Sequence, residues 1–379
     1  MGFSTDAIHF GQEHDSSTGA VIVPIYQTSI FAQERLGKDQ PYQYSRTGNP
    51  TRAALEKCLA RLEGGKDGLV FASGVAAIHA VLTLLNTGDH IIVGDNLYGG
   101  TYRLLEEVMK NWGLEITYVN TTKLNQLESS FRPSTRMLYV ETPSNPMMEI
   151  TDLTACVNLA HQRGVLMVAD NTFMSPYLQR PLEVGADIVI HSTTKYLNGH
   201  SDSIGGAVIL RDSGLGARLK IIQSSVGAVL SPFDSWLVLR SLKTLTVRMR
   251  QHNKNAAKVA EFLEKHPKVK EVFYPGSLSS PGYELAKKQM RGFGGMVSFE
   301  TGSLENAKKI SRALKLCVFS GSLGGVESIV SHPVTMSHFS LTSSQRKRSG
   351  LTEGLLRISV GLEDIKDILV DLDQALRGV

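Results

Sequence analysis

Short apolar runs alternate with helical patterns between residues 68 and 210, and this alternation restricts the fold more than any other feature of the chain. The expected strands are residues 68–71, 90–93, 115–119, 137–141, 165–169, 187–190 and 207–210. The helices expected between them include residues 75–85, 101–112 and 153–163. Such alternation is typical of a parallel sheet with helices on both faces. The sequence therefore predicts an α/β fold with a mostly parallel central sheet.

The segment before this region is expected to form an arm. Residues 1–50 hold an apolar stretch at 21–26 and then polar, loop-like sequence, so they must pack on something else. Asn49 suits the N-cap of a helix and Pro50 suits its first position. The predicted helix ends at a pair of glycines, residues 64–65.

A second domain is expected after the alternating region. A long helical stretch, residues 232–266, links the α/β domain at residues 51–245 to a smaller α+β domain at residues 246–379. The last helix of that domain is expected at residues 362–376. A chain of 379 residues with 42% hydrophobic and 20% charged residues is large enough for about two domains of ordinary size.

Composition argues against several classes of partner. The net charge is only +4, and the densest basic run, residues 346–348, is expected to be a solvated turn and not a nucleic-acid site. No apolar run approaches the ~18–20 residues of a membrane span, and we expect no signal peptide. Cys58, Cys156 and Cys317 are far apart, as expected for reduced residues of a cytoplasmic protein without a metal site.

A lysine follows a run of hydroxyl side chains just after the strand expected at 187–190. Ser192 and Thr194 can donate hydrogen bonds to a phosphate, and the amine of Lys195 can react with a carbonyl beside it. Asp170 lies just after the strand expected at 165–169. Because ligands of open α/β sheets bind at the carboxyl ends of the strands, we expect these groups to share one site.

These residues together fit pyridoxal phosphate held on Lys195 as a Schiff base. The carboxylate of Asp170 can pair with the pyridinium nitrogen, so that the ring withdraws electrons from the substrate. Burial and nearby positive charge would lower the pKa of the Lys195 amine and make it reactive. Taken alone, Lys195 could also be a surface charge, and Asp170 could be a metal ligand, a helix cap or part of an ion pair.

Three other positions support the same interpretation, and each has a simpler alternative. Gly74 follows a strand at a helix start that could bind an anion, although it could equally belong to a simple turn. Tyr98 could stack on a ring or pack in its loop. Arg357 lies in an apolar run and needs an anion, either a ligand or a structural ion pair. The G-x-G-x-x-G pattern of a nicotinamide dehydrogenase is missing.

Seven motifs span nearly the whole chain. They are Tyr44-Ser45-Arg46-Thr47-Gly48-Asn49-Pro50-Thr51, Ser73-Gly74, Tyr98-Gly99-Gly100-Thr101, Glu141-Thr142-Pro143-Ser144-Asn145-Pro146, Asp170-Asn171-Thr172-Phe173, Ser192-Thr193-Thr194-Lys195-Tyr196 and Arg357-Ile358-Ser359-Val360-Gly361. In these motifs and their order the chain resembles the cysteine–methionine metabolism family of pyridoxal-phosphate enzymes. The resemblance implies the aspartate-aminotransferase fold, known as fold type I, with residues 51–245 as the cofactor-binding domain.

The resemblance also implies a role for each cofactor contact. Lys195 would carry the cofactor and shuttle protons, Asp170 would pair with the ring nitrogen, and Tyr98 would stack on the ring. The remaining cofactor contacts within one subunit would be Gly74, Val75, Thr172, Ser192 and Thr194.

Two arm residues would act on another subunit. The resemblance implies that Tyr44 and Arg46 reach the phosphate of a neighbouring chain, which would make the active unit at least a dimer. The expected assembly is a homotetramer, a dimer of active dimers. For the substrate, Asn145 would lie near the ring hydroxyl and the carboxylate, and Arg357 would bind that carboxylate through its two-pronged fork.

The activity implied by the resemblance is cleavage of a carbon–sulfur bond. We expect γ-elimination of cystathionine to cysteine, 2-oxobutyrate and ammonia, with Tyr98 as an acid or base at the sulfur. Side activities as a β-lyase and as a cysteine or homocysteine desulfhydrase would release hydrogen sulfide. The alternatives are cystathionine γ-synthase, an O-acylhomoserine sulfhydrylase and cystathionine β-lyase. A non-catalytic pyridoxal-phosphate-binding protein is a further alternative, but every catalytic position is filled.

Two positions depart from patterns within the family. Many of its γ-synthases and γ-lyases have a glutamate just before the Ser-Leu-Gly of the substrate loop, where this chain has Gly321 before Ser322. Without that carboxylate, which can attract the distal ammonium of cystathionine, we expect a broader range of sulfur amino acids. Methionine γ-lyase has a cysteine two residues after its stacking tyrosine, where this chain has Gly100, so that activity is disfavoured.

Overall fold

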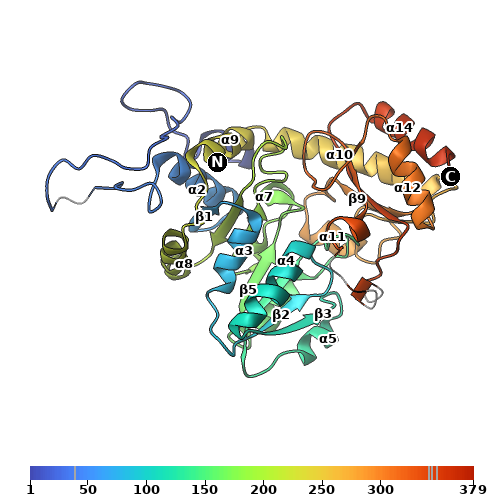
Figure 1. The fold of residues 1–379 in the computed structure, drawn as a ribbon, viewed down its shortest axis with the longest axis horizontal. Coiled ribbons are helices and arrows are strands. Elements are labelled where there is room, and N and C mark those ends of the chain that lie inside the picture. Colours follow the sequence, from blue (N-terminus) through green and yellow to red (C-terminus); the bar gives the residue numbers. More distant parts are fainter. Residues whose placement is uncertain (38–39, 340–341, 343–344, 347–348) are drawn as a thin grey trace.

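The computed structural model describes residues 1–37, 40–339, 342, 345–346 and 349–379 (Figure 1). Lys347 and Arg348, from the basic run expected to be a solvated turn, lie outside these residues. Figure 1 shows a body built around two sheets, with blue N-terminal loops projecting from one end. Within the described ranges, no helix is both long enough and apolar enough to cross a membrane.

The larger sheet has seven strands in the order β1-β7-β6-β5-β4-β2-β3. They are β1 (Asp67–Phe71), β2 (His90–Gly94), β3 (Glu115–Val119), β4 (Thr135–Glu141), β5 (Leu166–Asp170), β6 (Ile188–Ser192) and β7 (Gly206–Leu210). Strand β7 runs antiparallel to both of its neighbours, and all other pairs are parallel. The predicted mostly parallel sheet is confirmed, and the predicted strand ends fall within two residues of the observed ones.

Each face of this sheet is covered by its own hydrophobic core. On β6, Val189 belongs to one core, and its neighbours Ile188 and Ile190 belong to the other. Successive side chains of a strand point to opposite faces, so a continuous apolar run fills both cores. The first core packs against α2 (Pro50–Glu63), α6 (Leu153–His161) and α9 (Pro232–Leu242), and the second against α3 (Gly74–Leu82), α4 (Gly99–Leu104) and α8 (Ser213–Val226).

Local side-chain chemistry sets where several of these helices begin and end. The side chain of Asn49 accepts a hydrogen bond from the Thr51 N–H at 3.0 Å, and such a cap stabilises a helix by about 1 kcal/mol. The helix predicted at 101–112 begins at Gly99 and continues past α4 through one π turn and one 3₁₀ turn to Trp112. The short elements between strands are Leu105–Met109 (π), Lys110–Trp112 (3₁₀), α5 (Leu124–Ser129), α7 (Ser175–Leu178) and Pro181–Val184 (3₁₀).

The long helical stretch predicted at 232–266 is two helices, α9 and α10 (Leu245–Lys265). Between them the carbonyl of Ser241 accepts hydrogen bonds from the Thr244 N–H at 3.1 Å and from the Arg248 guanidinium at 2.9 Å. These bonds replace the regular helical pattern, so the chain turns at this point. Sequence periodicity on both sides of the turn is helical, which is why the break was not predicted.

The smaller sheet has five strands in the order β10-β11-β12-β9-β8. They are β8 (Glu271–Phe273), β9 (Met296–Glu300), β10 (Val318–Phe319), β11 (Ile329–Ser331) and β12 (Leu355–Ser359). A third core packs this sheet against α10, α12 (Leu304–Ala313) and α14 (Ile365–Arg377). This part of the chain also contains α11 (Tyr283–Gln289) and a 3₁₀ turn at Pro333–Thr335. The last helix begins at Ile365, three residues later than predicted.

The first residues of the segment predicted as an arm, residues 1–50, form a helix that contacts the body of the same chain. Helix α1 (Phe3–His9) carries Asp6, which forms an ion pair with Arg61 of α2 at 2.9 Å. Residues 13–48, called the arm below, contain an isolated bridge between Ile30 and Tyr44, and the carbonyl of Val23 accepts a hydrogen bond from the Trp236 indole of α9 at 3.1 Å. Large apolar side chains of the arm, including Ile30 at 68% exposure, face solvent in the single chain.

Candidate active site

A cavity of about 450 Å³ lies where the carboxyl ends of the central strands meet the smaller sheet. It brings together most of the residues that the sequence predicted for the site. These are Gly74, Val75, Tyr98, Asn145, Asp170, Thr172, Ser192, Thr194, Lys195, Gly321, Ser322 and Arg357. Tyr44 and Arg46 do not line it. Twelve of the fourteen predicted residues therefore share one cavity, and the two exceptions both belong to the arm.

Lys195 lies in the turn after β6, with its amine inside the cavity. The amine donates a hydrogen bond of 2.7 Å to the hydroxyl of Ser322, which belongs to the loop after β10. Burial, together with the positive charge of Arg357, lowers the pKa of Lys195 to about 8. A substantial fraction of the amine is therefore neutral near physiological pH, which is the form that can act as a nucleophile.

Asp170 is the last residue of β5, and both of its carboxylate oxygens are held. The hydroxyl of Tyr139, on the adjacent strand β4, donates to one oxygen at 3.0 Å. The Thr172 N–H donates to the other at 3.0 Å. These two bonds orient the carboxylate at the floor of the cavity. The sequence did not mark Tyr139 as part of the site, because its hydrogen bond to Asp170 depends on the pairing of β4 with β5.

The start of α3 forms the end of the cavity best suited to a phosphate. The hydroxyl of Ser73 caps the helix by accepting from the Ala76 N–H at 3.1 Å, while Gly74 and Val75 line the cavity. A Cβ added to Gly74 would lie 3.0 Å from the Cβ of Ser192, so the glycine lets the helix start lie close to β6. An anion here is favoured by the helix dipole and by the backbone N–H groups of the first turn.

Tyr98 stands at the edge of the cavity with 42% of its surface exposed. Its backbone N–H donates to the carboxylate of Glu141 at 2.9 Å, which fixes the start of α4. A Cβ on Gly100 would overlap the Tyr98 ring, so the glycine provides the room in which the ring lies. A cysteine at residue 100 would not fit beside the ring in this orientation.

Arg357 brings a buried positive charge from the smaller sheet. It is 3% exposed, and it donates to the Asn145 side-chain oxygen at 2.6 Å and to the Ser322 carbonyl at 3.1 Å. In the part of the chain that the structure describes, no carboxylate forms an ion pair with it. Burial lowers the pKa of Arg357 to about 10, so the group stays charged at neutral pH. A substrate carboxylate is the counterion that this arrangement lacks.

Two residues of the site were not assigned a role from the sequence. Glu141 pairs in register with Asp170, and burial together with the Asp170 charge raises the pKa of Glu141 well above its ordinary value. The buried imidazole of His338 lies 3.1 Å from the carbonyl oxygens of both Leu97 and Asn145. Because carbonyls only accept, His338 donates from Nε2 and joins the Tyr98 loop to the Asn145 loop. Glu141 opens a recognised motif, whereas nothing in the sequence marked His338.

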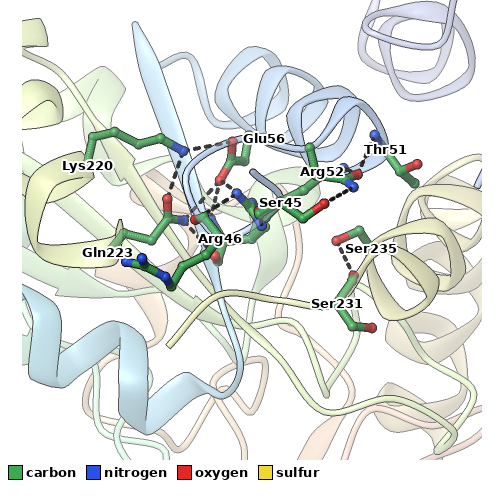
Figure 2. A network of polar contacts seen from close by, with 11 residues as sticks. Ser45, Arg46, Thr51, Arg52, Glu56, Lys220, Gln223, Ser231 and Ser235 are labelled. Carbon is green, nitrogen blue, oxygen red and sulfur yellow. Dashed lines mark hydrogen bonds and ion pairs between the residues drawn. The ribbon is translucent and has the colours of Figure 1, made fainter. Parts of the chain in front are cut away.

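The two arm residues, Tyr44 and Arg46, do not line the cavity. Figure 2 shows Arg46 near Ser45 and Arg52, at the start of α2. The Arg46 guanidinium donates to the Ser224 carbonyl and lies 5.3 Å from the centre of the Tyr44 ring. Tyr44 is 43% exposed. Within one chain, neither side chain contributes to the site formed by Lys195.

The residues of the cavity fit pyridoxal phosphate. A reactive amine, a held carboxylate, a helix start with hydroxyl groups and an aromatic ring surround one space, as the aldehyde, ring nitrogen, phosphate and ring face of that cofactor require. Lys195, Asp170 and Tyr98 would hold the reactive ring, and Gly74 and Ser192 would hold the phosphate. Among the described residues, no group of His, Cys, Asp and Glu side chains is arranged to hold a metal ion.

Comparisons with known proteins agree with this fit. A family model described as Cys/Met metabolism PLP-dependent enzyme matches residues 4–377. The chain is 50% identical over 379 residues to the cystathionine gamma-lyase of Bacillus subtilis (strain 168), with 100% of both chains covered. It is also 50% identical over 375 residues to the cystathionine beta-lyase of Coxiella burnetii, covering 98% of this chain and 97% of the relative.

A solved structure shows the same fold over the full length. The crystal structure of cystathionine gamma-lyase from Lactobacillus plantarum complexed with L-serine matches with a TM-score of 0.97 at 44% identity, covering 100% of this chain and 99% of that one. Curated relatives 47–50% identical to this chain are variously named cystathionine gamma-lyase, beta-lyase and gamma-synthase. The chain therefore belongs to the Cys/Met metabolism family of pyridoxal-phosphate-dependent enzymes, and it has their fold type I architecture.

Proposed function

We propose that this enzyme is a carbon–sulfur lyase that converts cystathionine and water to cysteine, 2-oxobutyrate and ammonia by γ-elimination. The observation that carries the proposal is the buried Arg357, which lacks a carboxylate partner among the described residues and lies beside the reactive amine of Lys195. An amino-acid carboxylate supplies the missing charge and directs the substrate amine toward Lys195. Relatives named cystathionine lyases support the choice of substrate class.

Each residue of the cavity has its own role in the proposed reaction. The bound cofactor supplies an electron-accepting ring that stabilises negative charge at the substrate Cα. Lys195 removes the Cα proton, and for γ-elimination it also moves a proton from Cβ. Asp170 keeps the ring nitrogen protonated, and the Tyr98 hydroxyl protonates the departing sulfur. Arg357 and Asn145 hold the carboxylate so that the Cα–H bond faces Lys195.

The substrate range follows from the end of the cavity near Gly321. A Cβ added to Gly321 would meet no atom within 4 Å, so the space beside this residue is open, and Gly321 itself contributes neither a side chain nor a charge. We propose that the site accepts several sulfur amino acids, with β-lyase activity and cysteine or homocysteine desulfhydrase activity that releases hydrogen sulfide. The γ-replacement activities, cystathionine γ-synthase and O-acylhomoserine sulfhydrylase, need the same residues and form the alternative, which the relative named cystathionine gamma-synthase favours.

We also propose that the arm completes the site of a second copy of this chain. Tyr44 and Arg46 offer a hydroxyl and a guanidinium, both suited to a phosphate, yet they lie outside the cavity of their own chain. Exposed apolar side chains on the arm need a protein surface to cover them. The proposed assembly is a homotetramer, a dimer of active dimers, in which residues 51–245 bind the cofactor and residues 246–379 form the C-terminal domain.

We propose a cytoplasmic location, which fits the reduced state of the three cysteines. Cys58, Cys156 and Cys317 are buried as free thiols, the state maintained in a reducing compartment.

Product analysis tests the proposed reaction. The purified enzyme is incubated with cystathionine, and a Lys195→Ala variant serves as the inactive control. Formation of cysteine and 2-oxobutyrate supports the proposed γ-cleavage. Formation of homocysteine and pyruvate would contradict it and show β-cleavage instead. A parallel incubation with O-acetylhomoserine or O-succinylhomoserine and cysteine tests the alternative, because net formation of cystathionine with no cleavage of it would make the enzyme a synthase.

A further inference from the structure

A buried arginine holds the turn that carries Tyr44 and Arg46. Arg52 lies in the first turn of α2 and is only 1% exposed, although it is one of the longest side chains in the protein. Its guanidinium donates to the Ser45 carbonyl at 2.8 Å and to the Arg46 carbonyl at 3.3 Å. Two donors of one rigid plane thus hold two successive carbonyls, which fixes the peptide between them.

Arg52 is anchored in turn by a carboxylate one turn further along α2. Its Nε lies 3.8 Å from Glu56, whose carboxylate also accepts from the Val70 N–H of β1 at 3.1 Å. Gln223 of α8 donates to the same oxygen at 3.1 Å, and the Lys220 amine lies 3.9 Å from the other oxygen. Figure 2 shows this group, which joins the arm to α2, β1 and α8.

The arrangement holds the backbone of the turn and leaves its side chains available. The Arg46 guanidinium contacts a backbone carbonyl, that of Ser224, and in the described residues it forms no ion pair. Tyr44 remains close to half exposed. A rigid backbone beneath two available polar side chains is what a site needs in order to present them to a ligand on another molecule.

We propose that Arg52 is a positioning residue that acts in trans: it orients the arm so that Tyr44 and Arg46 meet the cofactor phosphate in the site of the neighbouring subunit. This inference rests on the proposed function of the arm. Arg52 touches neither substrate nor cofactor, and its effect passes through the carbonyls of Ser45 and Arg46. A lysine at this position keeps the charge beside Glu56 and loses the two-pronged hold on the carbonyls.

Single variants provide the first test. Apo-enzyme carrying Arg52→Lys is titrated with pyridoxal phosphate, and the yellow absorbance of the lysine-linked cofactor is followed. The expected result is about tenfold weaker cofactor binding, equal to about 1.4 kcal/mol, with unchanged circular dichroism. Lys220→Met is the matched control, because it removes another cation from Glu56 without touching the turn, and it should bind the cofactor as the wild type does. Unchanged binding in Arg52→Lys would overturn the proposal.

Mixed dimers show in which subunit Arg52 acts. One chain carries Lys195→Ala, so that only its partner can form the yellow lysine-linked species, and two different affinity tags isolate the mixed assembly. Arg52→Lys on the Lys195→Ala chain should weaken cofactor binding about tenfold, because that chain supplies the arm to the competent site. Arg52→Lys on the chain with intact Lys195 should leave that site unchanged. An equal effect from both placements, or an effect only from the second, would contradict the trans role.

One measurement separates this inference from the proposal about the arm. Analytical ultracentrifugation of the wild type and of a variant that lacks residues 13–48 determines whether the arm holds subunits together. A monomeric wild type that binds the cofactor fully would overturn the role of the arm, and that of Arg52 with it. A dimer whose cofactor affinity depends on Tyr44 and Arg46 but not on Arg52 would preserve the role of the arm and reject only that of Arg52.

Discussion

The amine of Lys195 donates a 2.7 Å hydrogen bond to the hydroxyl of Ser322, a residue whose backbone φ is 104°. Residues other than glycine rarely adopt this conformation, and it costs on the order of 1–3 kcal/mol. The Ser322 carbonyl accepts from Arg357 as well. One strained residue thus connects the reactive amine to the group that we propose binds the substrate carboxylate.

Substitutions of Ser322 separate its hydroxyl from its backbone. Ser322→Ala and Ser322→Gly both remove the acceptor for Lys195, and we expect kcat to fall about tenfold in each, a loss of about 1.4 kcal/mol. Only glycine relieves the backbone strain, so Ser322→Gly should be about 1 kcal/mol more stable than Ser322→Ala. Steady-state kinetics and thermal unfolding measure the two effects. Equal stability of the two variants would show that the conformation of residue 322 carries no strain.

The positive charge of Arg357 should affect the pH at which the Lys195 amine loses its proton. With a pKa of about 8, the Lys195 amine becomes mostly neutral above that pH, so reaction of the apo-enzyme with pyridoxal phosphate should speed up to about pH 8 and then level off. Burial is the main cause of the lowered pKa, and the Arg357 charge adds to it. Removing a neighbouring cation makes protonation easier, so Arg357→Met should move the midpoint to higher pH.

A matched variant controls for the loss of the Arg357 hydrogen bonds. Arg357→Lys keeps a positive charge in the cavity while it removes the fork that binds Asn145, so its midpoint should stay near that of the wild type. A midpoint for Arg357→Met at or below the wild-type value would contradict the electrostatic explanation. The pH dependence of the yellow absorbance after rapid mixing is the measurement.

Gly321 provides a test of substrate range. A Cβ added to this residue would meet no atom within 4 Å, so Gly321→Glu can begin a side chain there without a clash and bring a carboxylate to this end of the cavity. We expect kcat/KM for cystathionine to rise about tenfold relative to that for cysteine, because the carboxylate attracts the distal ammonium. Gly321→Gln has nearly the same shape without the charge and should leave the ratio near that of the wild type. An equal gain in both variants would assign the effect to shape.

The carboxylate of Asp170 should matter much more than the hydroxyl that orients it. Asp170→Asn removes the charge that we propose keeps the ring nitrogen protonated, and kcat should fall about a hundredfold or more. Tyr139→Phe removes one hydrogen bond to Asp170, worth about 1 kcal/mol, and should cost only a few-fold. Steady-state kinetics of both variants provide the comparison. A larger loss in Tyr139→Phe than in Asp170→Asn would reverse the assignment of roles.

The sequence alone predicted the sheet and the part of the site that the sheet positions. Apolar runs marked the strands, and the carboxyl ends of parallel strands lie at one edge, so Asp170 and Ser192 were expected together. The short helix α1 was not predicted, because an isolated stretch of seven residues has little helical tendency and depends on packing against α2 and α10.

Only the tertiary structure determined how the two sheets share the site. The bonds of Lys195 to Ser322 and of Arg357 to Asn145 join residues 127 and 212 positions apart, and no local pattern encodes such distances. The pKa of Glu141 and the bonds of His338 likewise depend on which strands and loops lie side by side. Local residue patterns thus determined the elements and indicated the residues that we propose hold the cofactor. The placement of both sheets around one cavity decided which charges and donors meet there, because the strength of their interactions depends on burial and separation.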